Sequence, residues 1–176
     1  MEPIRCVYVE KKQGFDVDAG KLMHELTAQL GIEGLTGVRI FHRYQVQGID
    51  EGVFAEACRG IFAEPPVDHI YDTLPDLSDA RVFAIEYLPG QYDQRADSAA
   101  QCIQILTHGV RPLVRTARVI ALTGTLSEEA FGQVKDYCVN PVEARFADLQ
   151  TPKTLETEWE EPEAVATVDG FTGMDE

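Results

Sequence analysis

Two stretches of the sequence decide the fold prediction: PVDHIYDTL at residues 66–74 and PVEARFADL at residues 141–149. Both keep proline, valine, an acid, an aromatic residue and leucine in the same order and at the same internal spacing. Self-similarity at a fixed period is the mark of an internal repeat. We therefore predict that one α+β unit occurs twice, over residues 1–75 and 76–149.

The similarity extends upstream of these stretches with nearly constant spacing. The matching pairs are Glu10 with Glu86 and Gly14 with Gly90 (offset 76), Asp16 with Asp93 and Phe54 with Phe131 (offset 77), and Arg39 with Arg118 (offset 79). Chance similarity does not normally keep helices, strands and turns in phase over a whole unit. This alignment places Arg39 and Arg118 at equivalent positions of equivalent strands.

Each half has the pattern β-α-β-α-β. The first half contains predicted strands at 4–10, 35–47 and 67–74 and helices that begin after Asp16 and Asp50, both good N-cap residues. The second half contains predicted strands at 81–88, 114–124 and 142–149 and helices from about 94 and from 127. Such units form ferredoxin-like, split βαβ antiparallel sheets with helices on one face. Two copies in one chain can cover each other with pseudo-twofold symmetry, and the sequence leaves open whether they pack face to face or through strand edges.

Composition excludes some classes of function. The 176 residues carry a net charge of −15, which argues against a nucleic-acid partner because phosphate binding needs a basic face. No apolar stretch is long enough to span a bilayer, so we expect no membrane partner and a cytoplasmic protein. The four cysteines are far apart and lack zinc-type spacing, and we predict buried reduced thiols and no metal site; they are Cys6, Cys58, Cys102 and Cys138.

Four stretches carry a resemblance to a known family. They are VYVEKKQGFD at 7–16, VRIFHRYQV at 38–46, EYLPGQYDQRADSAAQCIQIL at 86–106 and NPVEARFADL at 140–149. Together they resemble the two-copy PurS-like N-terminal region of the large, single-chain phosphoribosylformylglycinamidine synthase. The resemblance covers essentially the whole chain and is most specific in the block at 88–102.

The resemblance implies a non-catalytic assembly domain of an ATP- and glutamine-dependent ligase of purine biosynthesis. Its partners are the synthetase and glutaminase domains of the same enzyme, in cis or in trans. ATP and Mg²⁺ are expected in the synthetase domain, and no cofactor is expected in this chain. No nucleotide-binding glycine loop or nucleophile elbow is found in these residues, so the chain is an enzyme only as part of the full-length protein. We expect that protein to continue past Glu176.

The polar cluster at Gln91–Asp97 is the first candidate site. Its members Gln91, Asp93, Gln94, Arg95 and Asp97 either cap a helix, form a domain interface or contact a small molecule. A capping role makes Asp93 or Asp97 the N-cap and pairs Arg95 with an acid.

Two further candidates carry arginines. Arg39 and Arg118 either line a shared anion site between the copies or pair locally with carboxylates. Arg43 lies in the basic, aromatic spot 42–44, which either contacts a partner or is a solvated strand edge.

The acidic segment 150–176 is predicted to be a linker toward the catalytic domains. Its aromatic residues Trp159 and Phe171 favour docking in the full-length protein, and simple disorder is the alternative. A rival function from another class is a free-standing ACT-like regulatory module that binds small molecules between its units. A third reading, an autonomous enzyme, has no motif in its favour.

Overall fold

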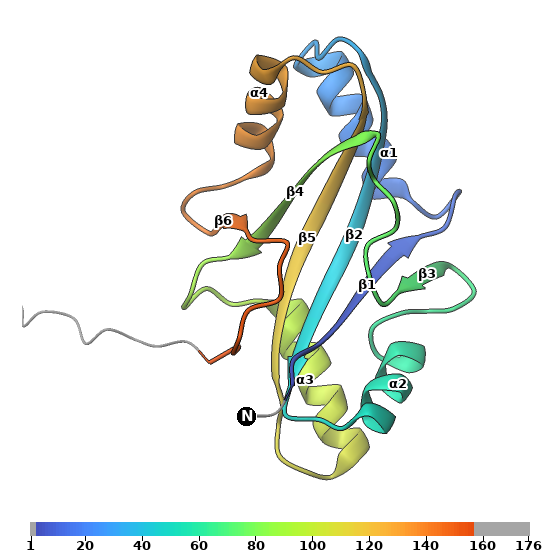
Figure 1. Ribbon diagram of the computed structural model, residues 1–176, viewed down its shortest axis with the longest axis vertical. Coiled ribbons are helices and arrows are strands. Elements are labelled where there is room, and N and C mark those ends of the chain that lie inside the picture. Colours follow the sequence, from blue (N-terminus) through green and yellow to red (C-terminus); the bar gives the residue numbers. More distant parts are fainter. Residues whose placement is uncertain (1–2, 157–176) are drawn as a thin grey trace, which may run out of the picture.

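The computed structural model describes residues 3–156, which form an α+β fold around one six-stranded antiparallel sheet (Figure 1). The strands are β1 (Arg5–Lys11), β2 (Leu35–Gln47), β3 (Asp68–Tyr71), β4 (Ala80–Tyr87), β5 (Leu113–Gly124) and β6 (Ala144–Ala147). The helices are α1 (Val17–His24) with its π-helical continuation η1 (Glu25–Gln29), α2 (Glu51–Gly60), α3 (Gln94–Thr107) and α4 (Glu128–Cys138). Every predicted strand and helix is present, with ends shifted by a few residues.

The strand order is β3-β1-β2-β5-β4-β6, so the third, first and second strands of each half follow one another from either edge inward. Residues before Asp72 form the first three strands and residues after Asp79 form the last three. The long strands β2 and β5 pair at the centre of the sheet, with Gln47 opposite Leu113. The two halves therefore join through strand edges, and the fold is compatible with a ferredoxin-like one.

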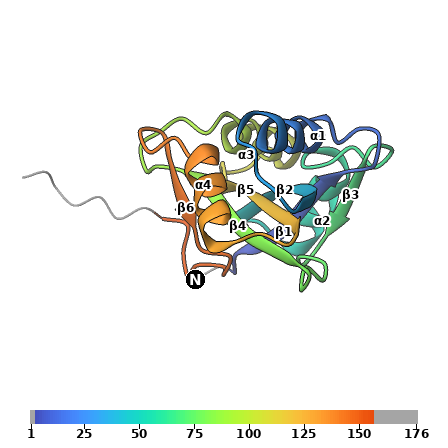
Figure 2. The same cartoon turned by 90° about the horizontal axis from the view of Figure 1, so that it is seen from above.

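All four helices pack on one face of the sheet; α1 and α3 appear together on that side in Figure 2. At one end of the long strands, Leu22 and Leu26 of α1 and η1 meet Val134 of α4 over strands of both halves. At the other end, α2 and α3 pack over β1 and β2, with Ala57 and Ile103 fully buried. Each core thus combines elements from both halves, which ties their stabilities together.

Side chains at the helix starts explain where three helices begin. Asp50, Asp93 and Ser127 accept hydrogen bonds from the third residue after each of them, which confirms the predicted caps at Asp50 and Asp93. Asp16 is an exception: its carboxylate accepts a hydrogen bond from Gly14 N at 2.9 Å, and α1 has no side-chain cap. The turn before α1 therefore uses the carboxylate that was expected to cap the helix.

The opposite face of the sheet is covered by the chain itself. After β3, residues 72–79 cross this face and bring Leu74 and Leu77 onto the buried Phe41 and Val119. After β6, residues 148–155 do the same at the other side, and Leu155 is only 5% exposed. The described start of the predicted linker is therefore packed on the sheet, while Trp159 and Phe171 lie outside the described residues.

Arg43 lies under this second crossing segment. It is 2% exposed, and its Nη1 donates to the Asp148 carbonyl at 2.6 Å. Tyr44 is similarly buried on the helix side, against Phe62. Both readings of Arg43, a partner contact and a solvated edge, are wrong, because β2 is a central strand that is covered on both faces.

Local details recur between the halves at nearly the spacing that the sequence shows. Lys12 N donates to Val67 O at 2.9 Å, and Leu88 N donates to Glu143 O at the same distance. Gly14 and Gly90 both have φ of +89°, a left-handed conformation that favours glycine. A left-handed glycine thus precedes both α1 and α3.

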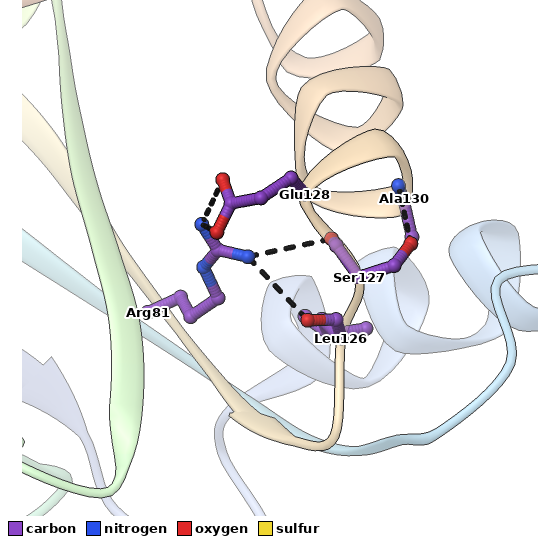
Figure 3. Close-up of polar contacts among 5 residues, drawn as sticks. All are labelled: Arg81, Leu126, Ser127, Glu128 and Ala130. Atoms are coloured by element: carbon purple, nitrogen blue, oxygen red, sulfur yellow. Dashed lines mark hydrogen bonds and ion pairs between the residues drawn. The ribbon is translucent and has the colours of Figure 1, made fainter.

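One recurring contact differs in strength. Arg5 donates one hydrogen bond to Ile49 O, at 3.3 Å, just before α2. Its counterpart Arg81 reaches the carbonyls of Leu126 and Ser127 and both carboxylate oxygens of Glu128 at the start of α4 (Figure 3). It also lies 4.0 Å from the centroid of the Phe131 ring. Arg81 therefore makes more contacts with the start of α4 than Arg5 makes with the residue before α2.

No helix within residues 3–156 is long and apolar enough to cross a membrane.

Candidate functional site

A hollow of about 770 Å³ opens on the helix-bearing face, between α3 and the segment that follows α4. Its floor includes His42 of β2 and Thr116 and Arg118 of β5. The wall from α3 includes Gln94, Arg95 and Ser98, and Asn140 and Glu143 line the opposite side. The volume is within the range of small-molecule sites, roughly 300 to 1,000 Å³.

The two arginines in the hollow are sparsely engaged. Arg95 donates from Nη1 to the Tyr44 hydroxyl at 3.0 Å, and this is the one hydrogen bond of its guanidinium within the described chain. The side chain of Arg118, whose backbone belongs to the sheet, makes no hydrogen bond or ion pair with any residue of the described segment 3–156. A guanidinium carries five N–H donors, so most of the donor capacity here is open to a ligand or to water.

The acids of the hollow are more fully engaged. Asp93 accepts from Ala96 N at 2.9 Å and from the Thr116 hydroxyl at 2.7 Å. Glu86 is ion-paired with Arg145, with the closest N–O distance at 2.7 Å. Glu143, which is exposed, is the remaining carboxylate of the lining. Asp93 and Glu86 therefore already have partners other than the two arginines.

His42 sits on the floor of the hollow. Burial, reinforced by the positive charges of Arg95 and Arg118, lowers its pKa from 6.5 to about 4. The imidazole is therefore neutral near pH 7, and the positive charge of the floor comes from the arginines.

The structure divides the predicted cluster at Gln91–Asp97. Asp93, Gln94 and Arg95 line the hollow, whereas Gln91 donates to Val142 O and Asp97 pairs with Arg111 outside it. Asp93 is the N-cap of α3, which confirms the capping interpretation for that residue. The predicted pairing of Arg95 with an acid is wrong, because its partner is the Tyr44 hydroxyl.

Arg39 and Arg118 do not share a site. Arg39 lies on the face away from the helices and forms a two-pronged ion pair with Glu10, at 2.7 and 2.8 Å. Arg118 lines the hollow on the helix-bearing face. Because side chains alternate along a strand, a shift by an odd number of residues relative to the true offset exchanges the two faces, as the offset of 79 does. The offset of 76, which relates Glu10 to Glu86, instead matches Arg118 with His42. The local ion pair predicted as the alternative is confirmed for Arg39.

Sequence reasoning missed Thr116, Ser98 and Asn140 as members of the site. One signal was available for Thr116: it lies two residues before Arg118 in a strand and so faces the same side. The prediction of buried cysteines is wrong for Cys102, which is exposed in the α3 wall of the hollow.

Within residues 3–156, no cluster of three His, Cys, Asp or Glu side chains is arranged to hold a metal ion. Comparison of the chain with protein families, with curated proteins and with solved structures finds no match.

Proposed function

We propose that this chain is a non-catalytic assembly domain of the PurS-like type, belonging to a phosphoribosylformylglycinamidine synthase. The observation that carries the proposal is the strand order β3-β1-β2-β5-β4-β6, in which two β-α-β-α-β halves join through their long strands. This arrangement is the one expected from the four sequence stretches that resemble the family, and so it supports the resemblance. The second half then acts as the built-in partner of the first.

We also infer that the halves arose by tandem duplication and are related by a pseudo-twofold axis. The axis would pass between β2 and β5 beside the pair His42 and Arg118, which lie opposite each other and occupy matching positions of the two halves. The recurring hydrogen bonds and the paired left-handed glycines support this inference, since unrelated halves have no reason to share turn geometry.

The second half offers the surface for assembly. Three apolar side chains are exposed along the β4–β6 edge: Tyr87 at 49%, Val142 at 73% and Phe146 at 42%. Exposed apolar groups beside an edge strand mark an interaction surface. The synthetase domain would pack against this edge and leave the β3 edge free.

The test is binding of the full chain to a separately produced synthetase domain, measured by calorimetry. We expect a dissociation constant in the micromolar range or below, and at least tenfold weaker binding by Val142→Asp. Val17→Asp is the matched control, because Val17 is also 73% exposed but lies in the first half. Absence of binding at micromolar concentration would overturn the assembly role, and equal weakening by both variants would overturn the choice of edge.

An ACT-like regulatory module remains the second candidate, and one observation favours it: the hollow lies beside the junction of the two halves. Modules of that type bind small amino acids between paired units. Calorimetric titration with glutamine and with other amino acids separates the two functions. Saturable binding of an amino acid favours the regulatory module. Absence of binding heat leaves the assembly role as the better function.

A further inference from the structure

We propose that the hollow between α3 and the segment after α4 is a binding site for a small oxyanion, a phosphate- or carboxylate-bearing molecule held by Arg118 and Arg95. The inference goes beyond the assembly role and does not depend on it. It rests on the lining of the hollow and on a comparison with the corresponding place in the first half.

The first half has a much smaller cavity at the corresponding place. It measures about 160 Å³ and is lined by residues around the start of α1 and by β2. At four matching positions the linings differ in chemistry: Val17, Asp18, Ile40 and His42 in the first half stand where the second half has Gln94, Arg95, Thr116 and Arg118. Two apolar side chains, an acid and a neutral imidazole are thus replaced by two polar side chains and two arginines.

These differences change what the cavity can hold. The first cavity contains Asp16 and Asp18, which would repel an anion, and its two cations, Lys11 and Arg39, are already ion-paired with Asp68 and Glu10. The second presents two guanidinium groups whose donors are largely unused within the described chain. Arginine matches the planar geometry of carboxylate and phosphate oxygens and binds them through paired, charge-assisted hydrogen bonds. An anion on the floor would meet Arg118 and Arg95, and its neutral part would extend toward Gln94, Ser98 and Asn140.

The size of the hollow argues for more than a simple ion. A volume of about 770 Å³ exceeds what an isolated phosphate fills, so the ligand class is an organic molecule with an anionic group at one end. The exposed Glu143 on the opposite side disfavours a second anionic group there and suits a hydroxyl or an amine.

The binding test uses the full chain with glycerol 3-phosphate and glycerate as probes, and glycerol as the uncharged control. We expect saturable calorimetric binding of at least one anion and none of glycerol. Arg118→Gln should weaken binding about tenfold or more, and Arg95→Gln should weaken it as well. Arg59→Gln removes the same charge from the exposed face of α2 and should leave binding unchanged. A preference for one probe assigns the anion as phosphate or carboxylate.

Two further measurements locate the site. Bound anion should slow alkylation of Cys102, which lies in the wall, and leave Cys58 on α2 unaffected. It should also shift the imidazole signals of His42 in the NMR spectrum and not those of His69. The charged groups that act on His42 are Arg95, Arg118, Lys11 and Asp18. An anion that offsets the two arginines raises the pKa of His42, so sulfate, which stays a dianion, should bind more tightly as pH falls from 7 to 5.

The proposal is overturned if no anion binds, or if Arg59→Gln weakens binding as much as Arg118→Gln, which would mean nonspecific attraction. It is also overturned if Cys102 and His42 do not respond while binding persists, since the anion would then lie elsewhere. Circular dichroism and thermal unfolding of Arg118→Gln establish that the variant is folded before its loss of binding is interpreted.

Discussion

The first half of the molecule closes the space between its first helix and the sheet, and the second half leaves the corresponding space open. Both halves build this region from a turn with a left-handed glycine, a helix and a long central strand. In the first, the cavity is about 160 Å³, and its lining is apolar and acidic apart from His42 and the ion-paired Lys11 and Arg39. In the second, it is about 770 Å³ and contains two arginines.

This difference teaches where function is to be sought. The shared residues, such as Gly14 and Gly90, maintain backbone geometry, and both of these glycines have φ of +89°. The residues that differ line a cavity beside the junction. Since a change of side chain at the wall of an open cavity costs little stability, such a position is free to carry different chemistry in the two halves.

The largest expected effect comes from the end of the β2–β5 junction. Gly124 has φ of +122°, and an added Cβ would collide with the Gly34 carbonyl and lie 2.9 Å from Thr36 N. Gly124→Ala should therefore lower the free energy of unfolding by more than about 3 kcal/mol. Gly14→Ala is the control: its φ is +89° but the added Cβ meets nothing within 4 Å, so only the backbone strain of about 1 to 2 kcal/mol applies. Urea denaturation of both variants measures the two losses, and equal losses would show that the halves are not held closely at this point.

The second prediction concerns the pH dependence of stability at His42. Its folded pKa of about 4 lies below the ordinary value of 6.5, so the neutral imidazole is favoured in the fold. The contribution of the neutral His42 to the free energy of unfolding is present in full above pH 6.5. It is lost as pH falls toward 4, where the free energy of unfolding is lower by about 3 kcal/mol. In His42→Gln that part of the acid destabilisation should disappear, as denaturation curves at pH 7 and pH 4 would reveal. Exposed His69→Gln should keep the wild-type dependence, and an unchanged pH profile in His42→Gln would refute the assignment.

The third prediction tests the segment 148–155, which lies on the far face of the sheet against β2 and β5. Leu155 is 5% exposed, its N–H donates to Gln47 Oε1 at 2.8 Å, and its carbonyl accepts from Arg115. Leu155→Ala should lower the free energy of unfolding by about 2 kcal/mol, the lower end of the range for a buried leucine. Leu149→Ala, at a position that is 39% exposed, should cost clearly less. Thermal unfolding of the two variants decides whether residues 148–155 belong to the folded unit.

The smallest expected effect is the difference in free energy of unfolding lost on replacing Arg81 and Arg5, which occupy matching positions in the two halves. Arg81→Ala removes contacts to two carbonyls and the Phe131 ring and should lower the free energy of unfolding by about 1 to 2 kcal/mol. Arg5→Ala removes a single 3.3 Å hydrogen bond and should cost about 0.5 kcal/mol. Because the Glu128 carboxylate is exposed, salt should weaken its pairing with Arg81 but leave the ring contact. Equal losses from both variants would mean that the extra contacts of the second half add nothing.

Local patterns predicted the elements well. Asp50 and Asp93 cap helices where they were expected to, because a cap depends on residues only two or three positions away. Asp16 failed as a cap because the neighbouring turn at Gly14 competes for the same carboxylate. Part of the candidate site was also predicted, through Asp93, Gln94, Arg95 and Arg118.

The error over Arg39 and Arg118 shows why the remainder was not predicted. Spacing alone does not identify the face of a strand, and a shift of an odd number of residues exchanges the faces. The offset of 76, which Glu10 and Glu86 already display, pairs Arg118 with His42 and keeps the faces matched. Arg43 was misjudged because the sequence does not reveal that β2 lies at the centre of a six-stranded sheet.

The sequence by itself determined the order of elements and the caps at Asp50 and Asp93, because these depend on contacts over a few residues. Only the tertiary structure decided that the halves join through β2 and β5, that residues 72–79 and 148–155 cover the far face, and that Arg95 and Arg118 share one hollow. Those outcomes depend on register and on long-range packing, in which a side chain's surroundings are supplied by residues distant in the chain.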